Sequence, residues 1–363
     1  MFYGCKERRS DHVKADSLIT IDGNISRKFN HRVMELPNVI ERFGSERDPI
    51  VYWKEKGSDV WTTQPPKNIG TYEVYAELPE DEQHLRAESQ HYEFVIGAMD
   101  LNVDVEDENV RAILQALVKN RNGIVTYEDI ACVKEINLQC NAHITSLKGI
   151  EYFTALTKLD CSYTKITSLD LRHHPALEVL ECGKTKLHSL DVSSNKRLKE
   201  VSCTLCEELT SLDIHGAESL EKLYCGGTGI THLDVHHHKN LTTLYCNNND
   251  KLVTLVTKGA DALTYLNCMH TGITCLDVSE NKRLIELECD NTGIEKLDVR
   301  NLPQLQTLGC SHSIDNSLTI IDARGATALR ELFADGNKRL QSLIVDDVDA
   351  LDYLSLEDIY VKR

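Results

Sequence analysis

Eight cysteines recur along the chain at a nearly constant interval, and a regular array of thiols could bind a soft metal or form disulfides. Successive members are 21 or 22 residues apart, and they are Cys161, Cys182, Cys203, Cys225, Cys246, Cys268, Cys289 and Cys310. In a stack of parallel strands, equivalent side chains lie about 4.8 Å apart, wider than the Cβ separation that a disulfide prefers. Because cysteine also behaves as a small buried hydrophobe, we expect these ladder cysteines to be free thiols in an interior. A metal column is the alternative.

Seven aspartates form a second column, and carboxylates in register could bind calcium. Each follows a leucine or isoleucine, and they are Asp170, Asp191, Asp213, Asp234, Asp277, Asp298 and Asp322. The G-G-x-G-x-D nonapeptide of calcium-binding β-helices is absent from the sequence. We therefore expect these carboxylates to accept hydrogen bonds from turn amides. A column of hydroxyl and amide side chains is expected to satisfy backbone groups in the same way. Its members are Thr164, Thr185, Thr228, Asn249, Thr271, Thr292 and Asn337.

Histidines and a pair of glutamates are the remaining candidates for catalytic or metal chemistry. His173–His174 and His236–His238 would lie in equivalent turns about 14 Å apart, too far for one metal, and we expect both turns to be solvated. Glu286 and Glu288 would share one strand face about 7 Å apart, which leaves a glycoside hydrolase as a remote alternative. The sequence contains no G-x-S-x-G, P-loop or H-E-x-x-H motif. We therefore expect no catalytic residue, no cofactor and no metal.

The charge balance bears on the class of partner. The 363 residues include 57 Asp and Glu against 40 Lys and Arg, which gives a formal net charge of −17. This balance disfavours nucleic acid and anionic lipid, because both attract basic surfaces. No run of 18 apolar residues occurs, so no transmembrane segment is predicted.

A single repeat frame must position these columns of side chains. It reads L-x-x-L-x-C-x-x-T-x-[IL]-x-x-L-D-V and recurs about eleven times over residues 133–363. Each repeat contains two short segments that alternate apolar and polar residues, as strands do, with turn residues between them. One repeat cannot bury its apolar side alone, so the repeats must stack. The predicted fold is therefore mainly β, a solenoid of about eleven coils with little helix.

The first third of the chain has a different pattern. Residues 16–100 contain alternating segments between Pro and Gly turns, which predict a small antiparallel β-sandwich after a flexible N-terminus at 1–15. Residues 101–132 are predicted to form an acidic linker and a helical cap over the first coil. Trp53 and Trp61 are interpreted as packing residues.

The repeat frame resembles the leucine-rich repeat family, with Cys in the third apolar position and Thr often in place of Asn. Its period and its L-D-V segment are similar to those of secreted or surface-anchored repeat proteins of bacteria. The segment Glu108–Leu138 is similar to the helical cap of those proteins, in which a degenerate EF-hand-like calcium loop precedes the repeats. Position 1 of that loop would be Val118, which cannot ligate calcium, and position 12 would be Asp129. The segments GTYEVYAEL and EFVI are similar to bacterial immunoglobulin-like modules.

The resemblance also implies a location. It favours an extracellular or cell-surface protein, although no signal peptide is recognised in this sequence. The segment Phe2–Cys5 resembles the end of a lipoprotein cleavage box, which would make Cys5 the site of a lipid anchor. The thirteen cysteines argue mildly in the other direction, because free thiols are less common in oxidising compartments.

We predict a non-enzymatic recognition protein that binds a protein or a glycan through the exposed strand face of the solenoid. A structural spacer or adhesion scaffold without a discrete ligand is the alternative. Tyrosine offers apolar area and a hydroxyl at low entropic cost, and neighbouring acids would favour a basic partner segment. Neither the ligand nor an oligomeric state follows from the sequence. The predicted contact residues are Tyr163, Tyr224, Tyr245, Asn247, Tyr265, Asn267, His270, Glu286, Glu288, Asp290, Phe333 and Tyr353.

Overall fold

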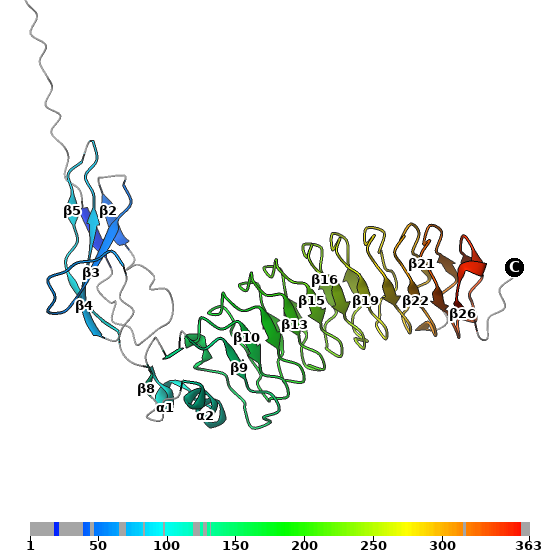
Figure 1. Ribbon diagram of the computed structural model, residues 1–363, viewed down its shortest axis with the longest axis horizontal. Coiled ribbons are helices and arrows are strands. Elements are labelled where there is room, and N and C mark those ends of the chain that lie inside the picture. Colours follow the sequence, from blue (N-terminus) through cyan, green and yellow to red (C-terminus); the bar gives the residue numbers. More distant parts are fainter. Residues whose placement is uncertain are drawn as a thin grey trace, which may run out of the picture. The chain divides into compact units, whose positions relative to one another are not determined.

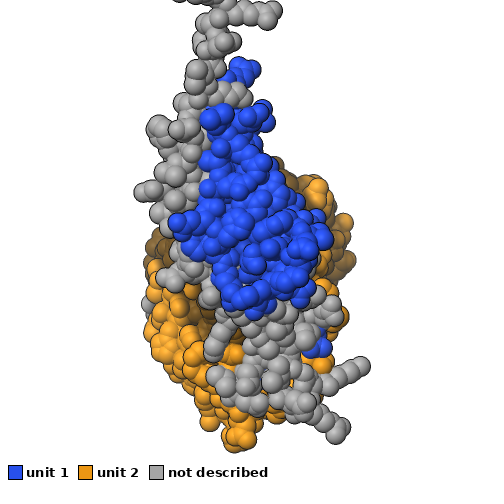
Figure 2. Space-filling view, turned by 90° about the vertical axis from the view of Figure 1, so that its left-hand side faces the viewer, with its two compact units in different colours: residues 1–101, 120–130 blue, residues 102–119, 131–363 orange. Residues whose placement is uncertain are grey.

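The structure is a computed structural model, and it divides the chain into two compact units. Unit 1 comprises residues 1–101 and 120–130, and unit 2 comprises residues 102–119 and 131–363 (Figure 2). The structure describes residues 18–21, 39–43, 47–64, 70–82, 84–96, 99–118, 124–125, 129–130, 132–314 and 317–356. The predicted flexible N-terminus, with Cys5, lies outside these described residues.

Within the described part of unit 1, the strands pair antiparallel. The central strand β4 pairs with β3 along one edge and with β5 and β6 along the other. Trp53 in β3 is buried, and the Trp61 ring packs edge-on against Tyr75 with centroids 4.8 Å apart, which confirms both tryptophans as packing residues. The immunoglobulin-like sandwich stays a prediction. The strands are β1 (Leu18–Ile21), β2 (Val39–Phe43), β3 (Ile50–Glu55), β4 (Gly70–Leu78), β5 (Ala87–Glu88), β6 (Tyr92–Ile96), β7 (Met99–Asp100) and β8 (Ile124–Val125).

Two short helices precede the coils, α1 (Leu101–Asp104) and α2 (Glu108–Leu117). Asp107 caps α2, because its Oδ1 accepts a hydrogen bond from the backbone N–H of Asn109 at 2.9 Å. Its Oδ2 accepts from the N–H of Thr145 at 2.9 Å, which ties the helix to the first coil of unit 2. Most of the predicted calcium loop, including residues 119–123, lies outside the described residues. None of the described helices has the length and apolar character needed to cross a membrane.

An eleven-stranded parallel sheet runs the length of unit 2, with one three-residue strand from each coil (Figure 1). The strands follow one another in chain order without a shift of register, so that Leu159 pairs with Leu180 and Leu244 with Leu266. We call this sheet the first face. Its strands are β9 (Glu135–Asn137), β10 (Lys158–Asp160), β11 (Val179–Glu181), β13 (Glu200–Ser202), β15 (Lys222–Tyr224), β17 (Thr243–Tyr245), β19 (Tyr265–Asn267), β20 (Glu286–Glu288), β22 (Thr307–Gly309), β24 (Glu331–Phe333) and β26 (Tyr353–Ser355).

The second face differs from the prediction of one strand per coil. Its strands form two pairs and one group of three, and the equivalent segments 168–170 and 275–277 form no strand. The strands are β12 (Ser189–Asp191), β14 (Ser211–Asp213), β16 (His232–Asp234), β18 (Thr254–Val256), β21 (Lys296–Asp298), β23 (Ile320–Asp322) and β25 (Ser342–Ile344). Two single turns of 3₁₀ helix, η1 (Ile150–Tyr152) and η3 (Val348–Ala350), complete the unit.

The ladder cysteines line the interior behind the first face. All eight are at most 3% exposed, and all are free thiols. Burial raises the pKa of each, to about 12 for Cys246. The threonine and asparagine column satisfies the backbone as predicted: Thr271 Oγ1 donates to the carbonyl oxygen of Cys268 at 2.8 Å, and Asn249 Nδ2 donates to those of Cys246 and Cys225 at 2.9 Å. The repeat frame therefore builds its interior from aliphatic groups, thiols and hydrogen-bonded hydroxyls.

The aspartate column caps the turn after each second-face segment, as predicted. Each of the seven accepts a hydrogen bond from the backbone N–H two residues later, as Asp191 does from Ser193 at 2.8 Å. In three coils an arginine also joins the carboxylate, and the hydrogen bond from Arg172 lowers the pKa of Asp170 to about 2. These carboxylates serve the turns, and among the described residues no group of three His, Cys, Asp or Glu side chains is arranged to hold a metal.

The prediction that both histidine turns are solvated is wrong for their last members. His174 and His238 are buried, at 0% and 2% exposure. Both occupy the position that Asn195 and Asn281 occupy in other coils, three residues after a buried aliphatic side chain. In that position a side-chain N–H donates a hydrogen bond to a carbonyl of the preceding coil. The burial of the two histidines therefore follows from their place in the repeat and not from their residue type.

The second residue after each ladder cysteine has a left-handed backbone conformation, with a positive φ. Tyr163 and Leu205 both have φ of 58°, and Gly227 has φ of 70°. The N–H of each such residue donates to the next coil, as Tyr163 does to the carbonyl oxygen of Gly183 at 2.9 Å. These bonds extend the strand ladder into the turn and hold the chain where it leaves the first face. The eight residues are Tyr163, Lys184, Leu205, Gly227, Asn248, His270, Asn291 and His312.

Candidate binding surface

The first face presents two outward rows of side chains. In each strand the middle residue points inward, and the residues before and after it point outward, because side chains alternate along a strand. Parallel pairing in register places equivalent residues of neighbouring coils side by side, for example Tyr224 beside Tyr245 and Asn267 beside Glu288. None of the twelve predicted contact residues is buried.

Three tyrosines lie on neighbouring strands near the middle of the sheet, and we call them the tyrosine cluster. The rings of Tyr224 and Tyr245 pack edge-to-face with centroids 5.5 Å apart. Tyr265 belongs to the next strand, β19, and Tyr245 and Tyr265 are 36% and 38% exposed. Burial of its body, followed by the charge of Glu286, raises the pKa of Tyr245. The phenol is therefore neutral at physiological pH and can donate a hydrogen bond to a ligand.

Three carboxylates follow the tyrosines in the next coil, and we call Glu286, Glu288 and Asp290 the acidic triad. Glu288 accepts a hydrogen bond from Asn267 Nδ2 at 2.5 Å, and Asp290 Oδ1 accepts from the N–H of Ser311 at 2.6 Å. Burial raises the pKa of Glu288, and the charges of Glu286 and Asp290 and a hydrogen bond with Glu286 add to the rise. The triad is therefore a crowded group of acids.

The two glutamates of the glycoside hydrolase alternative lie on one strand. Glu286 and Glu288 are the first and third residues of β20, on either side of the buried Leu287. Hydrolases of this class place a sugar between two carboxyl groups that are at least about 5 Å apart. The glycoside hydrolase stays an alternative prediction.

The coils nearer the N-terminus carry two ion pairs on the same face. Lys158 Nζ lies 2.7 Å from Glu181, and Lys222 Nζ lies 3.5 Å from Glu200, in each case across neighbouring strands. Exposed pairs of this kind contribute little to stability, typically below about 1 kcal/mol. They do give Glu181 and Glu200 a cationic partner, in contrast with the acidic triad.

The remaining predicted residues fall into separate places. Phe333 and Tyr353 pack together with ring centroids 5.0 Å apart, on the far side of β22 from the acidic triad. Tyr163 lies in the turn after β10 with Lys184 Nζ 5.2 Å from its ring centroid, and His270 is exposed at the left-handed position of its own turn. The structure thus joins the tyrosine cluster, Asn247, Asn267 and the acidic triad. The backbone N–H of His270 also donates to the carbonyl oxygen of Asp290 at 2.9 Å, which places His270 beside the triad, whereas Tyr163, Phe333 and Tyr353 lie apart.

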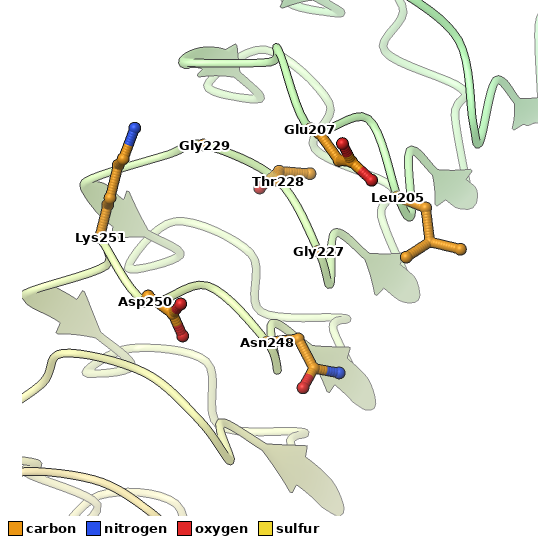
Figure 3. Close-up of a pocket in the computed structure, with 8 residues that line it drawn as sticks. All are labelled: Leu205, Glu207, Gly227, Thr228, Gly229, Asn248, Asp250 and Lys251. Carbon is orange, nitrogen blue, oxygen red and sulfur yellow. The ribbon is translucent and has the colours of Figure 1, made fainter. Parts of the chain in front are cut away.

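The predictions missed a shallow pocket at the turn edge, of about 630 Å³ including the solvent at its mouth. Figure 3 shows a glycine-containing coil recessed between two neighbours. The neighbouring coils, which begin at Cys203 and Cys246, are each one residue longer than the coil between them. This alternation of repeat length was the available clue. The lining residues are Leu205, Glu207, Gly227, Thr228, Gly229, Asn248, Asp250 and Lys251.

Comparison with known proteins finds similarity in structure only. No family model matches the chain, and no curated protein matches it significantly. The structural neighbours include internalins, which are bacterial leucine-rich repeat proteins. The functional domain of InlJ from Listeria monocytogenes, which includes a cysteine ladder, is 25% identical over 73% of this chain and 72% of its own, with a TM-score of 0.39. The internalin InlF of that species is 18% identical over 73% and 98%, with a TM-score of 0.47. Internalin C2 is 17% identical over 73% and 97%, with a TM-score of 0.41.

Proposed function

We propose that this chain is a non-enzymatic recognition protein of the cell surface or the extracellular space, which binds a protein or a glycan through the first face of its solenoid. The observation that carries the proposal is the tyrosine cluster. Tyr224 and Tyr245 stand in register with their rings in contact, and Tyr245 and Tyr265 keep more than a third of their surface in solvent. Large aromatic residues near the centre of a surface supply most of the binding energy in many interfaces.

The scaffold supports recognition because the face is already formed. Each strand of the first face is hydrogen-bonded to its neighbours, and the ladder continues into the left-handed turns. A ligand therefore orders few backbone groups when it binds, which lowers the entropic cost of association. The side chains around the tyrosines offer amides (Asn247 and Asn267) and carboxylates as hydrogen-bonding partners.

The proposal also gives a role to unit 1 and to the N-terminus. The antiparallel strands of unit 1 would act as an immunoglobulin-like spacer, and a lipid anchor at Cys5 would attach the protein to a surface. The competing proposal is a structural spacer without a discrete ligand, which the repeated, mostly polar surface of the coils also favours.

A glycan and peptide array probed with the full chain tests the proposed function. We expect at least one class of ligand to be retained, and the double variant Tyr224→Ala/Tyr245→Ala to weaken its binding by about 2 kcal/mol, or roughly thirtyfold. Val253→Ala is the control, because Val253 is exposed outside the first face, just before β18. Unchanged affinity in the double variant removes the cluster from the site, and an empty array favours the spacer.

A further inference from the structure

We propose that the ligand of the first face is a polypeptide with an extended, basic segment, whose Lys or Arg side chains lie on the acidic triad beside the tyrosine cluster. This inference rests on the proposed function and adds the chemistry of the partner.

The acidic triad lacks the lysine partners that two other glutamates have on this face. Lys158 pairs with Glu181 and Lys222 with Glu200, in each case across neighbouring strands. Among the described residues, no Lys or Arg side chain lies within ion-pair distance of the three triad carboxylates. The triad therefore presents three neighbouring carboxylates without a cation.

The structure crowds these carboxylates instead of separating them. Glu286 and Glu288 stand on either side of Leu287 in β20, and Asp290 adds a third acidic side chain two residues later in the same coil. Like charges held together in partial burial are destabilised until a cation joins them. The rise in the pKa of Glu288 is the expected consequence of that crowding. An ammonium or guanidinium group would relieve the repulsion, and a bidentate guanidinium would fit neighbouring carboxylates best.

The flanks of the triad suit the rest of a basic segment. On one side lie the tyrosine rings, which attract cations and cover the aliphatic stems of Lys and Arg. On the other side β22 presents only Thr307 and Gly309, so access to the carboxylates is not obstructed by a large side chain. The Phe333–Tyr353 pair lies beyond that strand. Strands β17 and β24 are separated by four strand spacings, which is about 19 Å along the sheet. An extended segment of about six residues spans that distance.

The experiment uses the full chain and a defined probe. A fluorescein-labelled octapeptide that alternates arginine and threonine is titrated by fluorescence anisotropy, beside peptides in which glutamine or glutamate replaces arginine. The protein variants are Glu286→Gln/Glu288→Gln and the control Glu181→Gln/Glu200→Gln. The control removes the same two charges, from the same two outward rows, at positions where a lysine is already paired.

We expect the arginine peptide to bind at least tenfold more tightly than the glutamine peptide. The triad variant should lose at least tenfold in affinity, and the control variant less than twofold. Equal losses in the two variants would overturn the inference, because they would mean that the net charge of −17 attracts the probe without a site. Equal binding of the arginine and glutamine peptides would overturn it as well.

The outcome also separates this inference from the proposed function. A glycan or neutral peptide whose binding is lost in Tyr224→Ala/Tyr245→Ala, but kept in Glu286→Gln/Glu288→Gln, would overturn the basic partner and leave the binding face intact. A ligand that neither variant weakens would overturn both. Thermal unfolding of each variant confirms that it is folded, and the triad variant should not be less stable, since it removes repulsion.

Discussion

The Nε2 atom of His238 lies 3.0 Å from the carbonyl oxygen of Ile214, which belongs to the preceding coil. Three coils earlier, His174 Nε2 lies 3.0 Å from the carbonyl oxygen of Ile150. A carbonyl can only accept, so each imidazole carries its proton on Nε2. The opposite ring atom, Nδ1, is buried and has no hydrogen-bond partner among the described residues. Protonation of Nδ1 would thus place a buried charge within the turn.

These two histidines should make the stack sensitive to acid. Burial lowers the pKa of His174 and of His238 from the ordinary value of 6.5. The unfolded chain then binds more protons than the folded one, so stability is full above about pH 6.5 and falls as pH drops toward the lowered folded pKa. For His174, the charges of Glu151 and Asp170 oppose the shift, and the charge of His173 adds to it. We expect the urea midpoint of the wild type to fall between pH 7.5 and 5.

The chain itself offers the matched control for this pH effect. Asn195 and Asn281 stand in the same column and donate to backbone carbonyls without titrating. The double variant His174→Asn/His238→Asn should keep the inter-coil hydrogen bonds and lose less stability over the same pH interval. A pH dependence identical to that of the wild type would show that other groups, such as the carboxylates, account for the acid sensitivity.

The reactivity of the cysteine thiols should depend on their burial. Cys132, Cys140 and Cys275 are exposed, whereas the ladder cysteines and Cys206 are buried. Burial also raises the pKa of the ladder thiols, so the reactive thiolate is scarce. We expect a thiol reagent to label the three exposed cysteines in the native protein and the buried ones only in denaturant, with positions assigned by mass spectrometry. Rapid native labelling of a ladder cysteine, or disulfides within the ladder, would contradict the buried interior.

The hydroxyl column should carry measurable stability. Thr271 Oγ1 donates to the carbonyl oxygen of Cys268 at 2.8 Å, and both groups are buried. Thr271→Val keeps the shape and removes the donor, so we expect a loss of about 1–3 kcal/mol. Thr271→Ser should restore most of it, and Thr231→Val, at an exposed position, should change little. A shift of the urea midpoint measures the effect, and equal shifts for Thr271→Val and Thr231→Val would mean that the hydrogen bond contributes nothing.

The sheet and its register could be predicted from the sequence because the repeat length is nearly constant. A period of 21 or 22 residues can be stacked in only one way that keeps every leucine and cysteine inside, so the contact between Tyr224 and Tyr245 followed directly. The interruptions of the strand ladder on the second face could not be predicted from the sequence. The segments Ser189–Asp191 and Ser168–Asp170 have the same S-L-D sequence, yet only the first forms a strand. The residues of a second-face segment therefore do not by themselves decide whether it forms a strand.

The buried histidines were misjudged for a different reason. Residue type alone predicts that a run of histidines in a turn is solvated, but the place of His174 and His238 in the repeat decides their burial. The asparagines three residues after Val192 and Val278 marked that place as one that reaches into the neighbouring coil. The left-handed turns are similar: Gly227 alone indicates positive φ, but Tyr163 and Leu205 adopt it because the next coil fixes their N–H groups.

The central claim is that ligand binds on the first face, and hydroxyl-radical footprinting of the full chain with the ligand recovered from the array tests it most directly. Tyr245 and Tyr265 are exposed and oxidise readily when free, and Leu205 and Val253 report on surfaces outside the face. We predict that saturating ligand protects the two tyrosines and leaves Leu205 and Val253 unchanged. Protection of Leu205 or Val253 with unchanged oxidation of the tyrosines would contradict the account.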